Sequence, residues 1–487
     1  MKVTDRWGVR PRTQTLTFLP RTLITDLSMR LFLQLILLVV GCSQLAAATP
    51  PNVIIIYADD LGWGDLGCYG HPNIRTPNLD RMAAEGMRFT EFYSAAEVCT
   101  PSRAALMTGR YPIRNGMCHD QFRVLRNNAK GGLPKDEVTL AELLKGRGYA
   151  TGMVGKWHLG HLPEHLPPQH GFDFYFGMPF SNDMMPAPDA PKGRERFFAE
   201  NNAYWRTPLI RGTNVVEAHP DQRQLTRRYT DESVKFIREH KRRPFFLYVA
   251  HSFPHVPLFA SEKFYGKSPA GLYGDVVEEI DWSVGELMAT LRRERLAEKT
   301  LVIFSSDNGP WLAYNHHGGS AGPLREGKGS TWEGGMRVPG IAWWPGRIKP
   351  SVQRQMATTM DIFPTVAKLA GAKLPERTLD GVDIAPLLFG SGTVDREAFF
   401  YYRGATLYAA RLGPWKAHFI TRSGYGPDKP APQDPPLLFH LGEDLGENWN
   451  RAAQQPEVIA KIKDAVARHR AALQPAPTQL AETIAQP

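Results

Sequence analysis

The chain has 487 residues, of which 42% are hydrophobic and 22% are charged, and its formal net charge is +9. This length allows one large hydrophobic core with a smaller unit beside it, and the composition is that of a globular protein. Six basic and two acidic residues fall within residues 1–48, so the rest of the chain carries about +5. That excess is mild and forms no basic stripe interleaved with aromatics. We therefore expect no nucleic-acid partner, whereas anionic ligands remain compatible.

The first 48 residues have the pattern of a secretory signal peptide. A basic residue precedes an apolar run at 31–41, and three alanines follow at 46–48. The run is short for a membrane span. The segment 39–42 also resembles a bacterial lipoprotein box, which would make Cys42 a lipidated N-terminus and leave the protein anchored. Both alternatives stay open, and in either case we expect export to the periplasm, the medium or the surface of the cell envelope.

Apolar strands alternate with helices over the next 260 residues. The predicted strands are 52–57, 150–154, 245–250 and 301–305, and the predicted helices are 79–86, 102–109, 138–145, 225–240 and 276–296. Continuous β-branched and apolar runs such as 52–57 are typical of strands buried on both faces. The alternation predicts an α/β fold with helices on both faces of one sheet. Residues 178–225 lack such a period, and we interpret them as a long surface insertion.

The pattern of the sequence changes at about residue 391. Short strands of an antiparallel sheet are predicted first, and a helix is predicted at 456–473. The tail from residue 474 has the composition of a frayed end. We therefore expect a larger domain at 49–390 and a C-terminal subdomain at 391–487.

Polar residues stand just past the carboxyl ends of four predicted strands, where open α/β sheets bind ligands. They are Asp59 and Asp60, Lys156 and His158, His251 and His255, and Asp307 and Asn308. Any single acidic residue in such a place more often caps a loop or a helix. Two acidic or amide pairs, each directly after an apolar strand, instead favour a metal site. Their hard oxygen ligands suit Ca²⁺ or Mg²⁺ rather than zinc.

Cysteine is rare, and after residue 48 only Cys68, Cys99 and Cys118 remain, an odd number that offers no disulfide framework. Cys99 comes just before the predicted helix at 102–109, where the helix dipole stabilises anions, and Arg103 follows four residues later. Two interpretations are open. Cys99 is either a nucleophilic thiolate of low pKa, or the attacking or modified group of an oxyanion-binding site.

Further cationic and imidazole groups support the second interpretation. Lys156, His158, His255 and Lys328 would converge with a divalent metal. Such a set describes a pocket for a tetrahedral oxyanion, either sulfate or phosphate.

The segment CTPSRAALMTGR, at 99–110, matches the sulfatase signature C-x-P-S-R-x-x-x-(L/M)-T-G-R. It is joined, in the order found in sulfatases, by YADDLGWGDLGCYG, GKWHLG, SSDNGP and REGKGSTWEGGMRVP. The likeness runs from about Asn52 to beyond Asn450. The chain thus resembles the formylglycine-dependent type I sulfatases of the alkaline-phosphatase superfamily, and is similar to the branch of N-acetylgalactosamine-6-sulfatase and arylsulfatase A.

This resemblance implies a fold and a cofactor. The fold is an alkaline-phosphatase-like α/β structure in which helices sandwich a large mixed, mostly parallel sheet, with a smaller C-terminal antiparallel sheet and a helix. In that family a formylglycine-generating enzyme oxidises the signature cysteine to Cα-formylglycine, so Cys99 is the implied precursor. Ca²⁺, or Mg²⁺, is the implied metal, and its implied ligands are Asp59, Asp60, residue 99, Asp307 and Asn308.

The resemblance also implies roles for a catalytic set. Its members are Cys99, Arg103, Lys156, His158, His255 and Lys328. Arg103 and Lys156 would hold the hydrated formylglycine, which attacks sulfur. His158 would take the proton from its second hydroxyl, and His255 and Lys328 would contact the sulfate and protonate the leaving oxygen.

The implied substrate is a sulfated sugar, with 6-sulfated N-acetylgalactosamine or galactose of a glycosaminoglycan-like or algal polysaccharide as the first expectation. Four alternatives are an arylsulfatase of other specificity, a phosphonate or phosphodiester hydrolase of the same superfamily, an inactive glycan-binding relative and a cysteine hydrolase. We predict that residues 178–225 and 313–322 wall the substrate pocket, because they lie between the motifs and lack core periodicity. The sequence does not indicate an oligomeric state.

Overall fold

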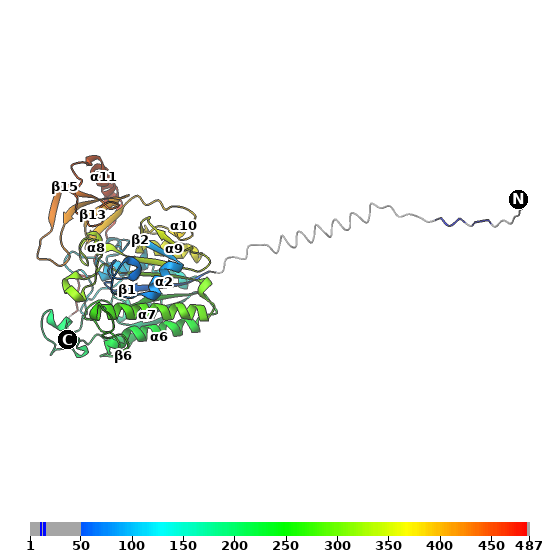
Figure 1. Ribbon diagram of the computed structural model, residues 1–487, viewed down its shortest axis with the longest axis horizontal. Coiled ribbons are helices and arrows are strands. Elements are labelled where there is room, and N and C mark those ends of the chain that lie inside the picture. The colour runs from blue at the N-terminus through cyan, green and yellow to red at the C-terminus, as the bar shows by residue number, and fades with distance from the viewer. Residues whose placement is uncertain (1–9, 12, 16–49, 485–487) are drawn as a thin grey trace. The chain divides into compact units, whose positions relative to one another are not determined.

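A computed structural model describes residues 10–11, 13–15 and 50–484 of the chain (Figure 1). The apolar run of the predicted signal peptide and the alternative lipoprotein box with Cys42 lie outside these residues. Among the helices that the structure describes, none has both the length and the apolar character needed to cross a membrane.

One large sheet organises residues 50–390. Its strands are β1 (Asn52–Ala58), β2 (Met87–Tyr93), β3 (Ala150–Gly155), β4 (Phe174–Gly177), β5 (Leu209–Arg211), β6 (Asn214–Glu217), β7 (Phe245–Ala250), β8 (Thr300–Ser306), β9 (Arg337–Trp343), β10 (Ser351–Gln353) and β11 (Ala357–Thr358). Their order is β10-β2-β9-β8-β1-β7-β3-β4-β5-β6, and β11 also pairs with β2. The five neighbours from β8 to β4 are parallel, whereas β9, β5 and β6 run antiparallel to their neighbours. The expected mixed, mostly parallel sheet is confirmed.

Helices cover both faces of this sheet. They are α2 (Pro77–Glu85), α3 (Cys99–Thr108), α4 (Pro112–Asn115), α5 (Leu140–Lys145), α6 (Leu225–Glu239), α7 (Gly271–Arg293), α8 (Glu333–Met336), α9 (Ile362–Leu369) and α10 (Ala385–Leu388). Residues of α2, α6 and α7 share one core with Ile54 and Ile56 of β1, and α6 and α7 lie side by side (Figure 1). Val53 and Ile55 face the opposite core, with α3, α5 and α9. Residues 53–56 of β1 are therefore continuously apolar because both faces of the strand are buried.

A second, four-stranded antiparallel sheet forms the C-terminal part. Its strands, in order, are β12 (Phe399–Arg403), β13 (Thr406–Leu412), β14 (Trp415–Thr421) and β15 (Ala431–His440). Helix α11 (Pro456–Ala472) packs on it through Ile459, Ile462 and Val466. Tyr93 and Tyr111 of the larger part belong to the same core, so the second sheet is packed onto the first part through aromatic residues.

Two segments are more ordered than the sequence suggested. Within 178–225, β5 and β6 extend the sheet, and Trp205 and Leu209 are buried, so this segment is not only a surface insertion. The tail is not frayed at 474–484. The Ala476 N–H donates to the Ile113 carbonyl at 2.9 Å, and Leu480 is buried. Both predictions were wrong because isolated apolar anchors leave no periodic pattern in the sequence.

Candidate active site

Four parallel strands end at one edge of the large sheet. Strands β8, β1, β7 and β3 are consecutive neighbours, so the residues that follow them meet there. The structure brings together Asp59, Asp60, Lys156, His158, His255, Asp307 and Asn308, all of them buried. His251 also follows β7, but it does not line the cavity at this edge. The sequence-based expectation of a shared site past these strand ends agrees with this arrangement.

Helix α3 directs its N-terminus at the same edge. The helix begins at Cys99, three residues before the predicted start, and every residue of it is buried. Pro101 fits inside the first turn because the N–H groups there have no partner within a helix. The helix ends at Gly109, whose φ of +69° and close approach to Phe363 leave no room for a side chain. The Cys99 Sγ lies 3.5 Å from Asp59 Oδ1.

Three buried cations pair with three buried carboxylates. Lys156 Nζ lies 2.6 Å from Asp59 Oδ2, and Lys328 Nζ lies 2.8 Å from Asp60 Oδ2. Arg103 reaches Asp307 Oδ2 at 2.8 Å and also donates to the Lys156 carbonyl at 3.0 Å. Arg103 is fully buried and its contacts are with these protein groups, so it supports the carboxylates from within the protein.

These pairs do not hold the three carboxylates at their usual pKa values. Burial raises the pKa of Asp60 to about 7, although Lys328 opposes the shift, and the neighbouring Asp59 and Asp307 raise it further. Burial and Asp59 likewise raise the pKa of Asp307. Burial also acts on Asp59, but Lys156 and Arg103 outweigh it and its pKa is lowered. Burial and the mutual repulsion of the carboxylates therefore disfavour the charged forms of Asp60 and Asp307, although the formal charges of the three pairs balance.

The same residues fit a hard divalent cation. The ligand atoms of Asp59, Asp60, Cys99 and Asp307 all lie within 4.8 Å of one another. Asn308 Oδ1 is buried and has no hydrogen-bond partner among the described residues. Carboxylate and amide oxygens are the ligands of Ca²⁺ and Mg²⁺, and such an ion would stabilise the charged forms of these closely spaced carboxylates.

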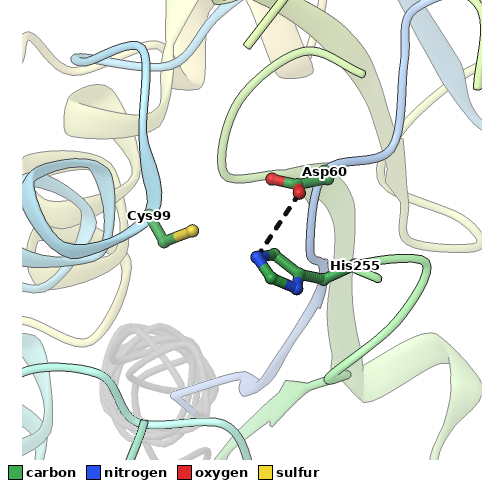
Figure 2. Close-up of side chains that lie close together, drawn as sticks. All are labelled: Asp60, Cys99 and His255. Carbon is green, nitrogen blue, oxygen red and sulfur yellow. Dashed lines mark ion pairs between the residues drawn. The ribbon is translucent and has the colours of Figure 1, made fainter. Parts of the chain in front are cut away.

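Cys99 does not have the properties of an activated thiolate. Burial raises its pKa well above the usual value for a thiol, although Lys156 and Lys328 lower it. The thiol therefore stays protonated at neutral pH, which speaks against the cysteine hydrolase. Figure 2 shows its sulfur directed toward Asp60 and His255, and the His255 Nε2 lies 3.7 Å from Asp60 Oδ2. The side chain at position 99 thus points at the reactive groups.

Both histidines are held neutral with one ring nitrogen available. His158 Nε2 donates to the Leu125 carbonyl at 2.9 Å, which leaves the lone pair on a buried Nδ1 without a partner in the described part of the chain. His255 Nδ1 donates to the Val256 carbonyl at 2.6 Å, so its Nε2 is the available nitrogen. Burial and nearby lysines lower the pKa of both rings well below 6.5. His158 also adopts a φ of +60°, a strained conformation often found at functional sites.

A cavity of about 650 Å³ opens onto these groups. Cys99, His158, His255 and Lys328 line it, as a pocket of ligand size requires. Six further lining residues were not singled out by the sequence, although two of them fall within the predicted wall segment 178–225: Arg123, Arg126, Asp183, Arg196, Trp311 and Tyr425. They lie on irregular segments, and their only sequence signal is that the segments are polar and lie between motifs.

The two segments expected to wall the pocket behave differently. Ser181, residues 183–186, Arg196 and Phe197 line the cavity, in agreement with the prediction for 178–225. Residues 313–322 do not line it. Tyr314 instead packs on Phe197 from behind, with ring centroids 5.1 Å apart. This second segment supports the wall without forming it.

Comparisons with known proteins match most of the chain. Residues 51–372 match the sulfatase family, and residues 394–487 match the C-terminal region of aryl-sulfatase. The chain is 44% identical over 474 residues to arylsulfatase A of Bos taurus, covering 90% of this chain and 92% of that protein. It is 42% identical over 484 residues to N-acetylgalactosamine-6-sulfatase of Canis lupus familiaris, covering 92% and 91%. The solved structure of Ps i-CgsB in complex with k-i-k-neocarrahexaose is similar with a TM-score of 0.73 and 30% identity, covering 86% and 92%.

Proposed function

The chain belongs to the sulfatase family and hydrolyses sulfate esters, and from this premise we propose that its substrate is a sulfated sugar. We propose 6-sulfated N-acetylgalactosamine or galactose of a glycosaminoglycan-like or algal polysaccharide as that sugar. The observation that carries this proposal is the 42% identity to an N-acetylgalactosamine-6-sulfatase across nine-tenths of both chains. The complex of Ps i-CgsB with a carbohydrate supports a saccharide as the ligand.

The proposed cofactors are a divalent cation, Ca²⁺ by preference, and the formylglycine made from Cys99 by a formylglycine-generating enzyme. Asp59, Asp60, Asp307 and Asn308 would hold the cation, and residue 99 would complete its ligands. When present, the cation withdraws charge from the sulfate, and hydrated formylglycine supplies an attacking hydroxyl and a second hydroxyl whose deprotonation expels sulfate.

The chain's own residues would bind the sulfate and move the protons. Lys156 and Lys328 carry positive charge to either side of residue 99, beside Asp59 and Asp60. His158 is neutral with a free Nδ1 lone pair, so it is suited to accept the proton of the second hydroxyl. His255 presents Nε2, and bound sulfate would raise its pKa so that it can protonate the leaving oxygen. Arg103 would hold Asp307 in place.

We further propose that the protein is exported and that its parts divide at about residue 390. The leader at 1–48 supports export, by cleavage or as a lipoprotein. Residues 49–390 would form the catalytic domain. The subdomain at 391–487 would complete the pocket, since Tyr425 lines the cavity from the loop between β14 and β15.

A second candidate is an arylsulfatase of other specificity. The specific observation that favours it is the 44% identity to arylsulfatase A over 90% of this chain. It would use the same reaction centre and differ only in the leaving group that the cavity accepts.

The test is sulfate release from N-acetylgalactosamine 6-sulfate compared with its 4-sulfated isomer. The protein is produced together with a formylglycine-generating enzyme, and the conversion of Cys99 is checked by peptide mass. Preferential release from the 6-sulfate supports the proposal. The control is hydrolysis of an aryl sulfate whose aryl group carries no charge, with Cys99 shown to be converted. If that control reacts and neither sugar releases sulfate, the proposed substrate is overturned and the second candidate is left.

A further inference from the structure

The cavity carries more positive charge than the removal of one sulfate requires. Its charged lining residues, apart from the buried groups at the strand ends, are Arg123, Arg126, Arg196 and Asp183. Three guanidinium groups thus face one carboxylate. They come from separate elements, since Arg123 and Arg126 lie between α4 and α5, and Arg196 lies in the 3-10 helix η4 (Glu195–Phe197). Their convergence depends on the fold and is not the result of one basic run.

Arg196 has a half-exposed side chain with a buried Nε. No carboxylate of the described residues forms an ion pair with it, and its buried Nε has no hydrogen-bond acceptor there. Its guanidinium lies over the rings of Phe197 and Trp205, at 5.3 and 5.4 Å from their centroids. These rings orient the group but accept no conventional hydrogen bond. The buried Nε–H lacks an acceptor among the described residues while the side chain is half-exposed, so this geometry leaves the guanidinium able to bind an anionic partner.

Arg123 also lacks a hydrogen-bond acceptor for one of its donors among the described residues. One of its terminal nitrogens pairs with the buried Glu97, whereas its buried Nε has no acceptor among the described residues. A guanidinium fork matches the planar or tetrahedral oxygens of a carboxylate or sulfate better than a lysine does. Arg123 can therefore hold Glu97 and still offer a donor to the cavity.

An aromatic surface lies next to the reaction centre. The rings of Trp311 and Tyr425 have centroids 5.0 Å apart, and Lys328 Nζ lies 4.0 Å from the centre of Trp311. His255 packs on the same Trp311, with centroids 5.2 Å apart. A sugar ring can lie on such a surface with one sulfate at the reactive groups and another substituent directed at the arginines.

We propose that the cavity binds a second anionic group of the substrate, a sulfate ester or a carboxylate, at Arg196 and Arg123, distinct from the sulfate that is removed. The inference rests on the proposed sugar sulfatase function and narrows its substrate to a saccharide with at least two acidic groups. Arg196 is then a residue that determines specificity and takes no part in the reaction at residue 99.

The experiment compares kcat/KM on four probes with the protein matured at Cys99. They are 4-methylumbelliferyl sulfate, N-acetylgalactosamine 6-sulfate, N-acetylgalactosamine 4,6-disulfate, and the 6-sulfated disaccharide with an unsaturated uronate. We expect at least one doubly acidic probe to exceed the monosulfate by about tenfold or more. Preference for the disulfate identifies a sulfate ester as the second group, and preference for the uronate disaccharide identifies a carboxylate.

The variant Arg196→Gln should lower kcat/KM on the preferred doubly acidic probe by about 10- to 100-fold, the value of a hydrogen bond to a charged group. Turnover of the aryl sulfate should stay within about twofold, and Arg196→Lys should recover part of the loss. Arg194→Gln is the matched control, because Arg194 lies on the same segment, stacks on Tyr314 and does not line the cavity. Equal losses on all probes, or no preference for a second acidic group, would overturn the inference.

A binding measurement separates this inference from the proposed function. Calorimetry with the Cys99→Ser protein compares the monosulfate with the two doubly acidic saccharides, so it does not depend on turnover. Tighter binding of a doubly acidic saccharide that Arg196→Gln abolishes supports the second anion site even if no sugar is hydrolysed. Equal affinities for all three would reject it, whatever the enzyme hydrolyses.

Discussion

Two clusters of buried charged residues in this protein differ in the direction in which the pKa of a central carboxylate is shifted. The strand-end cluster comprises Asp59, Asp60, Asp307, Arg103, Lys156 and Lys328. The joint cluster links the large sheet to the C-terminal sheet and comprises Glu333, Lys416, Glu447, Arg337 and Arg411. In the strand-end cluster burial raises the pKa of Asp60 to about 7, whereas in the joint cluster Lys416 and two arginines outweigh burial and lower the pKa of Glu333 to about 2.

The difference lies in how the charges are arranged. In the joint cluster, Lys416 Nζ sits between two carboxylates, 2.9 Å from Glu333 and 3.0 Å from Glu447. All four carboxylate oxygens of these glutamates have partners, including the Tyr93 hydroxyl at 2.6 Å. In the strand-end cluster three carboxylates face one another, and Asn308 Oδ1 has no partner among the described residues. Buried charge therefore does not indicate a functional site by itself. Buried polar oxygens that lack partners, and buried carboxylates that face one another, do indicate such a site.

The largest effect should come from removing the reactive group of the strand-end cluster. Cys99→Ala should lower aryl sulfate turnover by about 10⁴-fold or more, since loss of a nucleophile removes the whole reaction path. The measurement is 4-methylumbelliferyl sulfate hydrolysis together with a thermal unfolding curve. Cys118→Ala is the control, because Cys118 is also buried and free but does not line the cavity. Retained activity in Cys99→Ala would contradict the assignment.

The joint cluster should instead respond in stability. Lys416→Ala leaves Glu333 and Glu447 buried without their shared ammonium, so the free energy of unfolding should fall by about 3–5 kcal/mol. Denaturant unfolding measures this loss, and Lys461→Ala, at an exposed position on α11, should change it by less than about 0.5 kcal/mol. If Lys416→Ala unfolds like the wild type, the joint cluster is not a stabilising element.

Calcium should bind the strand-end cluster and not the joint cluster, and its binding should stabilise the folded protein. An ion at 100 times its Kd should raise the free energy of unfolding by about 2.7 kcal/mol, measured as a shift in Tm relative to protein in chelator. Asn308→Ala removes the unpartnered amide oxygen and should reduce this shift at a fixed calcium concentration. Lys416→Ala should keep the shift in full. A calcium shift that is equal in Asn308→Ala and the wild type would place the ion elsewhere.

Lowering the pH should remove the stability that Glu333 of the joint cluster contributes. The pKa of Glu333 is about 2 in the folded protein and about 4.5 when unfolded, so the stability it contributes is present above pH 4.5. That contribution is lost as the pH falls from 4.5 toward 2. Glu333→Gln should therefore be less stable than the wild type at neutral pH and show a flatter fall of stability between these two values. Unfolding curves measured in steps across this window test it, and an unchanged slope would contradict the role of Glu333.

The sequence predicted the three carboxylates and Lys156 of the strand-end cluster well because they follow recognisable strands, whereas Arg103 lies on α3 and Lys328 lies between β8 and β9. Asp59 directly follows β1, and Asp307 follows the four apolar residues 301–304 and two serines of β8; parallel neighbours then bring these strand ends together. The joint cluster could not be predicted in this way. Glu333 lies 83 residues from Lys416 and 114 from Glu447, and no local pattern pairs them.

The cavity walls could be predicted from the sequence less well than the strand-end cluster but better than the joint cluster. The segment 178–225 was expected to form a wall, but nothing in its sequence distinguishes Arg196, which lines the cavity, from Arg194, which does not. The start of α3 was predicted three residues too late because Pro101 is compatible with several positions in a first helical turn. Side chains on irregular segments are oriented by tertiary packing, so their direction cannot be read from spacing.

The burial of Cys99 has a consequence for the order of events during biosynthesis. The residue is 1% exposed at the start of a helix whose every residue is buried. If Cys99 is the precursor of formylglycine, as proposed, the enzyme that oxidises it has to reach the thiol before this segment is packed. Oxidation and folding therefore compete in time, and a chain that folds first would be trapped with a thiol that the maturation enzyme cannot reach. The ratio of formylglycine to cysteine at position 99 in purified protein would then report the rate of oxidation relative to the rate of folding.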